Sequence, residues 1–512
     1  MLQEDKKRIA VNTVVLYIRM IVIMLVSLFT SRKVLEVLGV DDYGIMNVVG
    51  GVVSMMAFLN GSMTVATQRF LTYELGRKDT ARYRRVFSMS MFIHLIIAGI
   101  ILFLCETAGL WMVNSVLNIP SDRMAAANVV YQASILSLIF GIVQTPYTAS
   151  VISHENMGFY AYMSIAGAVM KLLIVYLLLT VPYDSLAVYA ILLLCVNMLM
   201  TAVYSIYCRV KYAECHIAGI WDRGIFRSMV SFTGWNMFGT VAWILKDQGI
   251  NILMNLFSGP AVNAARGVSM QVSASVKNLI SGFQTAVNPQ ITKSYAGGNI
   301  QDMHKLMFTS SKVSFFLFLV LALPIAIETP YILNLWLKDV PEYSVLFTRI
   351  IIVEALADTL SGPFITGLMA TGIIRWYQIV IGSLIILNIP VSYLLLKAGC
   401  PIETPLIVSL SVTVISIAGR AIFAKFLAGV SLRSYLRSVI FPVAAVVVLS
   451  GVLPVFQSSC MDEGFIRLVA TTLTSLLSVS AVSYLVGLDR NEKNFVVSGL
   501  RSMKVRLGGN RN

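Results

Sequence analysis

The chain contains 512 residues, of which 57% are hydrophobic and only 12% are charged, and its mean hydropathy is +0.80. Ordinary soluble domains carry about 25% charged residues, so this composition excludes a water-soluble protein and predicts an all-α polytopic membrane protein. The net charge of +14 comes from basic residues dispersed over the loops, which argues against a nucleic-acid-binding protein.

Apolar runs long enough to cross about 30 Å of hydrocarbon predict fourteen transmembrane helices. In chain order they are 9–31, 43–66, 86–114, 124–150, 160–181, 186–208, 230–256, 261–289, 313–337, 345–370, 377–397, 403–427, 439–456 and 466–487. Basic residues favour every second connecting segment, so we expect both termini in the cytoplasm. The outer loops are too short for a catalytic domain, and no residue spacing indicates a metal site. We therefore expect a protein that is not an enzyme.

Two pairs of similar segments indicate an internal repeat. "VLGVDDYGIMNVVGGVVSM" resembles "LFSGPAVNAARGVSMQVSA", with Gly39 opposite Gly259, and "LTYELGRKDTARYRRVF" resembles "TKSYAGGNIQDMHKLMF" at nearly the same offset. The repeat unit spans six helices, an even number, so both copies have the same orientation in the membrane. We expect an N-terminal lobe at 1–215, a C-terminal lobe at 216–430, two further helices at 431–487 and a basic cytoplasmic tail at 488–512 that lies near anionic lipid head groups.

Seven ionisable side chains fall near the middle of predicted spans: Arg19, Lys171, Lys246, Asp247, Lys277, Glu354 and Asp358. Insertion costs about 3 kcal/mol for each, so we expect these side chains to avoid lipid. On 261–289, helical spacing places Lys277 and Gln284 on one face with Arg266, which predicts a cationic stripe that lines water or a polar helix. Arg349 and Arg420 lie near the ends of spans and are interpreted as interfacial.

The excess of cations over carboxylates predicts a site for an anion. Its candidate residues are Arg19, Lys246, Arg266, Lys277 and Gln284. Under the alternative interpretation, Lys246 and Asp247 belong to buried ion pairs that only fix helix packing.

Three carboxylates are candidates for binding a coupling ion, H⁺ or Na⁺. Glu354 and Asp358 lie one helical turn apart and share a face. Two close carboxylates are difficult to ionise together in a low-dielectric site, which favours binding of a proton or Na⁺. Asp247 is the third candidate. The alternative for Glu354 and Asp358 is structural pairing with Arg19 or Lys171. No other cofactor is predicted.

Nearly the whole chain resembles one known family. The fourteen spans, the parallel six-helix repeat and stretches such as "LGVDDYGIMNVVGGVVSMMAFLNGSMTVATQRFLTYELG", "GWNMFGTVAWILKDQGINILMNLFSGPAVNAARG" and "FQTAVNPQITKSYAGG" resemble the polysaccharide transporter branch of the multidrug/oligosaccharidyl-lipid/polysaccharide exporter (MOP) superfamily. Within that branch the chain resembles the Wzx-type O-antigen flippases.

The resemblance implies a MATE-like fold and a flippase in the bacterial inner membrane. Its substrate would be an undecaprenyl-pyrophosphate-linked oligosaccharide, an O-antigen, capsular or exopolysaccharide unit of polysaccharide or lipopolysaccharide biosynthesis. Alternating access through a cationic central cavity would carry it across. Membrane lipid and a polymerase or chain-length regulator of the same pathway are the expected partners.

Three other functions stay open on the sequence. A drug or organic-cation antiporter of the same fold would exchange its substrate for H⁺ or Na⁺, and a lipid II flippase also fits the helix count. A membrane glycan polymerase or ligase is disfavoured, because those enzymes need a large outer loop or a cluster of catalytic residues at an interface.

Overall fold

A computed structural model describes residues 2–56, 58–116, 119–179, 184–217, 221–337, 340–490 and 492–494. All regular elements in these ranges are helices, so the predicted all-α fold class is confirmed. The chain divides into two compact units. The N-terminal unit is Asn12–Met237, and the C-terminal unit is Phe238–Asn512 together with Met1–Val11. The predicted basic tail lies outside the described residues from residue 495 onward.

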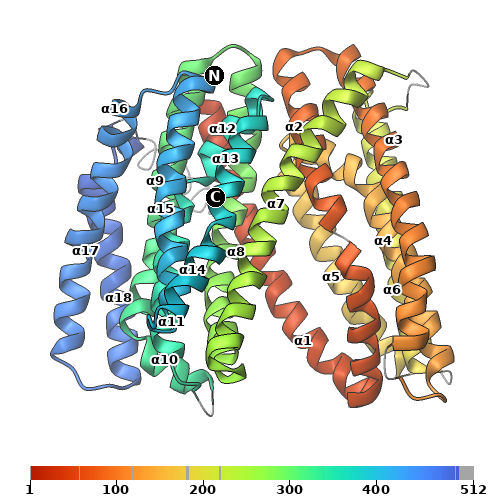
Figure 1. The fold of residues 1–512 in the computed structure, drawn as a ribbon. Helices are drawn as coiled ribbons and strands as arrows, with labels where there is room; N and C mark the ends of the chain where they lie inside the picture. Colours follow the sequence, from red (N-terminus) through yellow and green to blue (C-terminus); the bar gives the residue numbers. More distant parts are fainter. Residues whose placement is uncertain are drawn as a thin grey trace, which may run out of the picture. The chain divides into compact units, whose positions relative to one another are not determined.

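The N-terminal unit is built from six helices and the first part of a seventh (Figure 1). Their bounds are α1 Leu2–Met56, α2 Phe58–Arg77, α3 Thr80–Leu104, α4 Met124–Ser153, α5 Met157–Leu178, α6 Ser185–Lys211 and α7 Arg223–Ser258, with π-helical turns at Cys105–Gly109 and Met112–Val116. A core of buried apolar residues from α1, α3, α4, α5 and α6 holds these helices together.

Polar residues define where several of these helices begin. The side chains of Asp79, Asn156 and Asp184 accept hydrogen bonds from backbone N–H groups in the first turns of α3, α5 and α6. Each such cap satisfies a donor that has no partner within its helix. Asp184 also pairs with Arg123, which donates to it at 2.5 Å and also binds Asp42 of α1. This three-residue bridge ties the part of α1 that follows its kink at Gly39 to the N-terminal ends of α4 and α6.

The C-terminal unit contains the remaining helices. Their bounds are α8 Pro260–Ala296, α9 Ile300–Ile327, α10 Thr329–Trp336, α11 Ser344–Thr359, α12 Gly362–Thr371, α13 Arg375–Ile386, α14 Asn388–Lys397, α15 Thr404–Ala428, α16 Leu432–Tyr435, α17 Phe441–Ser459 and α18 Phe465–Val482, with π-helical turns at Leu436–Ile440 and Ser483–Gly487. The pair α17 and α18 packs against α9. Two apolar clusters, one centred on Phe347 and one on Phe318, form the core.

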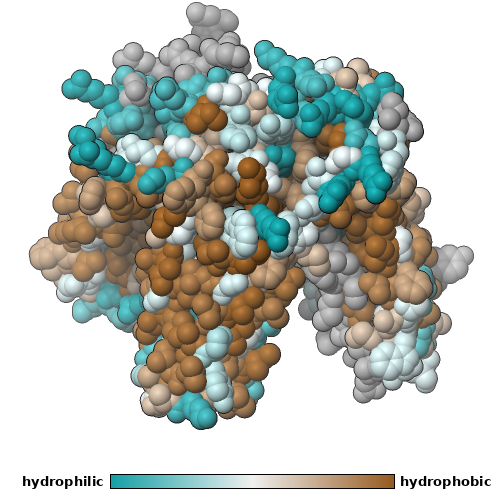
Figure 2. All heavy atoms as spheres, turned by 45° about the horizontal axis from the view of Figure 1, so that its top comes forward, coloured by the Kyte–Doolittle hydropathy of each residue, from teal (hydrophilic) through white to brown (hydrophobic). Residues whose placement is uncertain are grey.

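Several predicted continuous spans are interrupted. The span expected at 345–370 consists of α11 and α12, because the chain leaves the helix at Leu360 and restarts at Gly362 with Pro363 in the first turn. Within the described ranges, nine helices are long and apolar enough to cross a membrane, so the count of fourteen is not confirmed. Figure 2 shows hydrophobic residues along the sides of the helices and hydrophilic residues near their ends, as expected for a polytopic membrane protein.

Backbone conformation supports the internal repeat. Gly39 within α1 has φ 77° and ψ 175°, and Gly259 between α7 and α8 has φ 80° and ψ −175°. A second pair lies at the same offset, where Lys78 and Gly298 both have positive φ in the turns before α3 and α9. Positive φ is uncommon outside glycine. Two pairs of positive-φ residues at the same sequence offset therefore indicate that the backbone of the two copies turns at equivalent positions.

The end of the described chain is fixed to α9. Lys312 of α9 lies 2.6 Å from the carboxylate of Glu492 and also donates to the carbonyl of Gly487 at 3.3 Å. Thr309 donates to the same carboxylate at 2.7 Å. Glu492 and Asp489 accept hydrogen bonds from each other's backbone N–H groups, which closes one helical turn.

Candidate functional site

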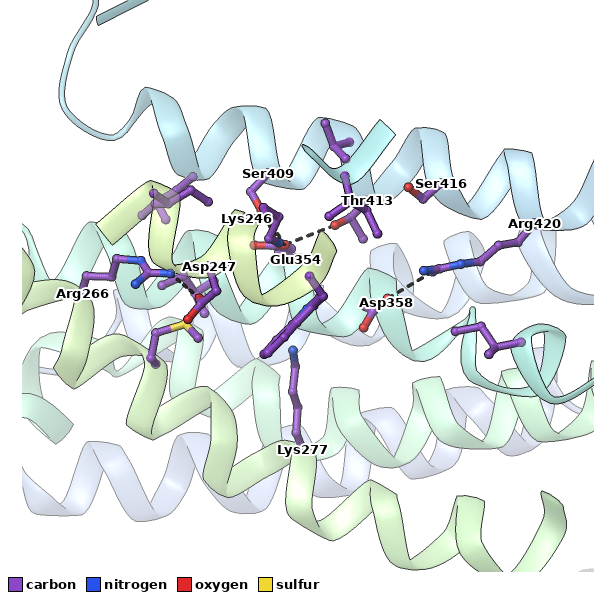
Figure 3. Close-up of a pocket in the computed structure, with 18 residues that line it drawn as sticks. Lys246, Asp247, Arg266, Lys277, Glu354, Asp358, Ser409, Thr413, Ser416 and Arg420 are labelled. Carbon is purple, nitrogen blue, oxygen red and sulfur yellow. Dashed lines mark hydrogen bonds and ion pairs between the residues drawn. The ribbon is translucent and has the colours of Figure 1, made fainter. Parts of the chain in front are cut away.

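A pocket of about 220 Å³ lies within the C-terminal unit (Figure 3). Its walls come mainly from α7, α8, α11 and α15. Seven charged side chains line it: Lys246 and Asp247 of α7, Arg266 and Lys277 of α8, Glu354 and Asp358 of α11, and Arg420 of α15. Four cations thus meet three carboxylates, and the pocket has an excess of one positive charge. Six of the eight predicted site residues lie together here, including all three carboxylates.

Arg266 and Asp247 form the first ion pair of the pocket. The guanidinium donates to the carboxylate at 2.5 Å, and the two side chains are 7% and 20% exposed. Such a buried pair is costly to desolvate and is strongly destabilised when one partner is removed. Arg266 Nε is buried without a hydrogen-bond partner, so one donor of this guanidinium is still unsatisfied.

Lys246 and Glu354 form the second pair. Lys246 Nζ lies 3.0 Å from the Glu354 carboxylate and donates to the hydroxyl of Ser409 at 2.8 Å. The hydroxyls of Ser409 and Thr413, both on α15, donate to the same carboxylate at 2.7 and 3.2 Å. The adjacent charges Lys246 and Asp247 therefore do not pair with each other. Each binds a partner on a different helix.

Arg420 and Asp358 form the third pair, with 3.4 Å between the guanidinium and the carboxylate. The interfacial position predicted for Arg420 is wrong, because the side chain is buried and lines the pocket. The signal that would have found it is the recurrence of Ser409, Thr413, Ser416 and Arg420 every three or four residues along α15.

Glu354 and Asp358 line the same pocket but have different cationic partners. They lie one turn apart on α11 as predicted, but Lys246 neutralises one and Arg420 contacts the other. Within the C-terminal unit, the structure gives both carboxylates cationic partners, in place of the Arg19 or Lys171 that the structural alternative named. The arrangement is therefore two separate ion pairs beside α15, where Ser409 and Thr413 donate to Glu354 and Arg420 contacts Asp358.

Lys277 is the cation in excess. Figure 3 shows its side chain extending from α8 into the pocket, and it is exposed. Within the described part of the chain, it forms no ion pair or hydrogen bond. The pocket also holds buried donors without an acceptor, at Arg420 Nε and the hydroxyl of Ser416. These groups can receive an anion or a neutral acceptor such as a sugar hydroxyl.

Two predicted site residues lie elsewhere. Gln284 of α8 does not line the pocket, and its amide lies against Gly362 of α12, where any side chain on that glycine would collide with it. Arg19 belongs to the N-terminal unit, where its guanidinium lies over the ring of Tyr160, 4.5 Å from the ring centre, and donates to the Tyr160 hydroxyl at 3.5 Å. Its Nε is buried without a partner.

A protein-family model described as MatE matches residues 248–394 of the chain. The matched region runs from α7 into α14 and includes Arg266, Lys277, Glu354 and Asp358. No curated protein matches the chain.

Solved structures of MATE transporters share the fold. The outward-facing conformation of a multidrug resistance MATE family transporter of the MOP superfamily superposes with a TM-score of 0.71 at 12% identity, covering 83% of this chain and 96% of that one. The MATE transporter ClbM in complex with Rb⁺ gives 0.69 at 18% identity, with 83% and 95% covered. A MOP superfamily transporter from Pyrococcus furiosus, described as having a binding pocket of reversed polarity, gives 0.67 at 12% identity, with 83% and 96% covered.

Proposed function

We propose that this protein is a flippase that moves a lipid-linked oligosaccharide with an anionic head group, such as an undecaprenyl-pyrophosphate-linked O-antigen, capsular or exopolysaccharide unit, across the bacterial inner membrane. The observation that carries the proposal is the unpaired Lys277 in a pocket whose other charges are neutralised in pairs. The MATE transporter fold supports a transport cycle of alternating access.

Lys277 supplies what an anionic head group needs. Moving a phosphate from water into hydrocarbon is prohibitively costly unless a cation compensates its charge. Lys277 offers three donors with no competing carboxylate partner, whereas Lys246 and Arg266 would each have to release one. The carboxylates Asp247, Glu354 and Asp358 are the candidates for binding the coupling H⁺ or Na⁺ whenever a cation leaves them. Arg19 of the N-terminal unit is a candidate for a further phosphate contact.

The test is glycan export by Lys277→Ala. In a strain that lacks its own flippase, we expect the variant to reach the membrane at the parent level and to lower export at least tenfold, about 1.4 kcal/mol of lost stabilisation. The lipid-linked glycan should then accumulate in the cytoplasmic leaflet. Lys397→Ala removes an exposed lysine at the end of α14 and serves as the matched control. Export by Lys277→Ala at the parent rate would exclude the proposal.

A drug or organic-cation antiporter is the second candidate. It is favoured by Asp358, whose side chain is 48% exposed and could attract a cationic drug. The matching test is efflux of a lipophilic cation from loaded proteoliposomes in a proton or sodium gradient. Efflux that depends on Asp358 but not on Lys277 would favour the antiporter.

A further inference from the structure

The charges of the pocket differ in how accessible they are. Five of the seven belong to side chains that are at most 20% exposed and paired at close range or buried. The other two are Lys277, which is exposed, and Asp358, which is 48% exposed. The two charges that a ligand can reach directly therefore have opposite signs.

The Asp358 carboxylate can also accept further hydrogen bonds. Its one contact with Arg420, at 3.4 Å, is near the upper limit for a hydrogen bond. An ionised carboxylate has about four acceptor positions, so most of those on Asp358 are still available. Figure 3 shows Asp358 on α11 across the pocket from Lys277 on α8. The indole of Trp243, which is half exposed, also lines the pocket.

The size of the pocket limits what it can hold. Pockets for drug-sized ligands measure about 300–1,000 Å³, and this one is smaller, at about 220 Å³. A complete oligosaccharide does not fit. The pocket has room for one sugar substituent or one small head group.

We propose that the pocket binds a zwitterionic group, with its anionic part on Lys277 and its ammonium part on Asp358. The inference rests on the proposed function: it adds that the transported glycan or its head group carries both charges close together. A simple anion on Lys277 is repelled by the Asp358 carboxylate, and a simple cation on Asp358 is repelled by Lys277. A zwitterion satisfies both side chains and leaves the net charge of the pocket unchanged.

Three small probes separate these cases. We would measure binding of phosphoethanolamine, methyl phosphate and ethanolamine to the full chain in lipid nanodiscs by calorimetry. Phosphoethanolamine carries both charges, and the other two carry one each. We expect the parent protein to bind phosphoethanolamine about tenfold more tightly than either single-charge probe, the effect of one additional partly desolvated ion pair.

Substitutions of Asp358 and Lys277 test which side chain binds the ammonium group and which binds the phosphate group. Asp358→Asn should weaken phosphoethanolamine binding about tenfold and leave methyl phosphate unchanged or bound more tightly. Lys277→Ala should weaken binding of both phosphate-containing probes and leave ethanolamine unchanged or bound more tightly. Asp462→Asn and Lys397→Ala, which alter exposed residues outside the pocket, are the matched controls and should bind all three probes as the parent does.

Several results would overturn the inference. Equal affinity of the parent for phosphoethanolamine and methyl phosphate, or no binding of phosphoethanolamine at millimolar concentration, is incompatible with it. If Asp358→Asn changes nothing while Lys277→Ala abolishes phosphate binding, the ligand is a plain anion and only the proposed function survives. If Lys277→Ala retains phosphate binding, the proposed function fails as well.

A direct ion pair between Lys277 and Asp358 is the remaining alternative. It predicts that Lys277→Ala and Asp358→Asn each lower the midpoint of thermal unfolding. The exchanged double variant Lys277→Asp/Asp358→Lys would then restore that midpoint. Such a recovery would show that the two side chains serve each other, and the zwitterion inference would be wrong. We expect no recovery.

Discussion

The buried pair of Lys312 and Glu492 should respond unequally to the loss of either partner. The two side chains are only 4% and 8% exposed, so neither charge can turn to water without movement of the backbone. Glu492→Gln keeps the shape of the side chain but leaves the buried ammonium group of Lys312 on α9 without its counter-charge. Removing one partner of a buried ion pair typically costs about 3–5 kcal/mol, and we expect a loss of unfolding free energy in this range.

Lys312→Met should cost less. The unpaired charge then lies on the terminal segment, which can separate from α9 and return Glu492 to water, so the loss is limited to the contacts of Glu492 with α9. The double variant should lie within about 1 kcal/mol of the parent, because replacing both members of a buried pair is often nearly neutral.

Equilibrium unfolding in detergent, followed by circular dichroism, measures the free energies. Hydrogen exchange of the segment 488–494 separates local undocking from loss of the whole unit. Asp462→Asn, an exposed carboxylate, is the control and should change little. A loss below about 1 kcal/mol for Glu492→Gln, or a double variant as unstable as the sum of the two single variants, would refute the reasoning.

Two further predictions concern Gly259 and the bridge formed by Arg123, Asp42 and Asp184. Gly259→Ala should lower stability by about 1–2 kcal/mol because its φ of 80° is unfavourable for residues with a Cβ, whereas Gly267→Ala within α8, with open space around it, should be neutral or slightly stabilising in the same unfolding assay. Although partial burial opposes it, hydrogen bonds from Ala187 and Arg123 hold the pKa of Asp184 below its usual 3.8. The stability that this carboxylate provides is therefore present above that value and is lost as the pH falls through the folded-state pKa. In a pH series of thermal unfolding midpoints, Asp184→Asn should abolish this loss of stability at acidic pH. An unchanged acid-side slope would count against the bridge.

Features that depend on spacing along one helix were predictable from the sequence. Composition predicted the helical membrane fold, and the position of Lys277 on one face of α8 predicted a cation that lines a polar space. The shared conformation of Gly39 and Gly259 agrees with the repeat inferred from weak sequence similarity.

The pairing of the charges was not predictable in the same way. Lys246 meets Glu354 across 108 residues, and Arg420 meets Asp358 across 62. Such contacts depend on which helices become neighbours, and helical periodicity contains no information on that. Arg420 was misplaced because it was judged by its distance from the end of the span predicted at 403–427, although the helix face that it shares with Ser409 and Thr413 is buried in the pocket lining.

Under the proposed function, the ion pairs of the pocket have a consequence for the protein without cargo. Since Lys246, Arg266 and Arg420 already have counter-charges within the protein, the vacant pocket does not need to recruit ions from solution to be electrically balanced, apart from a single lysine. In a carrier of this kind, the return step without cargo would meet little electrostatic resistance. Turnover would then be governed by how readily cargo leaves, and resetting the protein would contribute little to the overall rate.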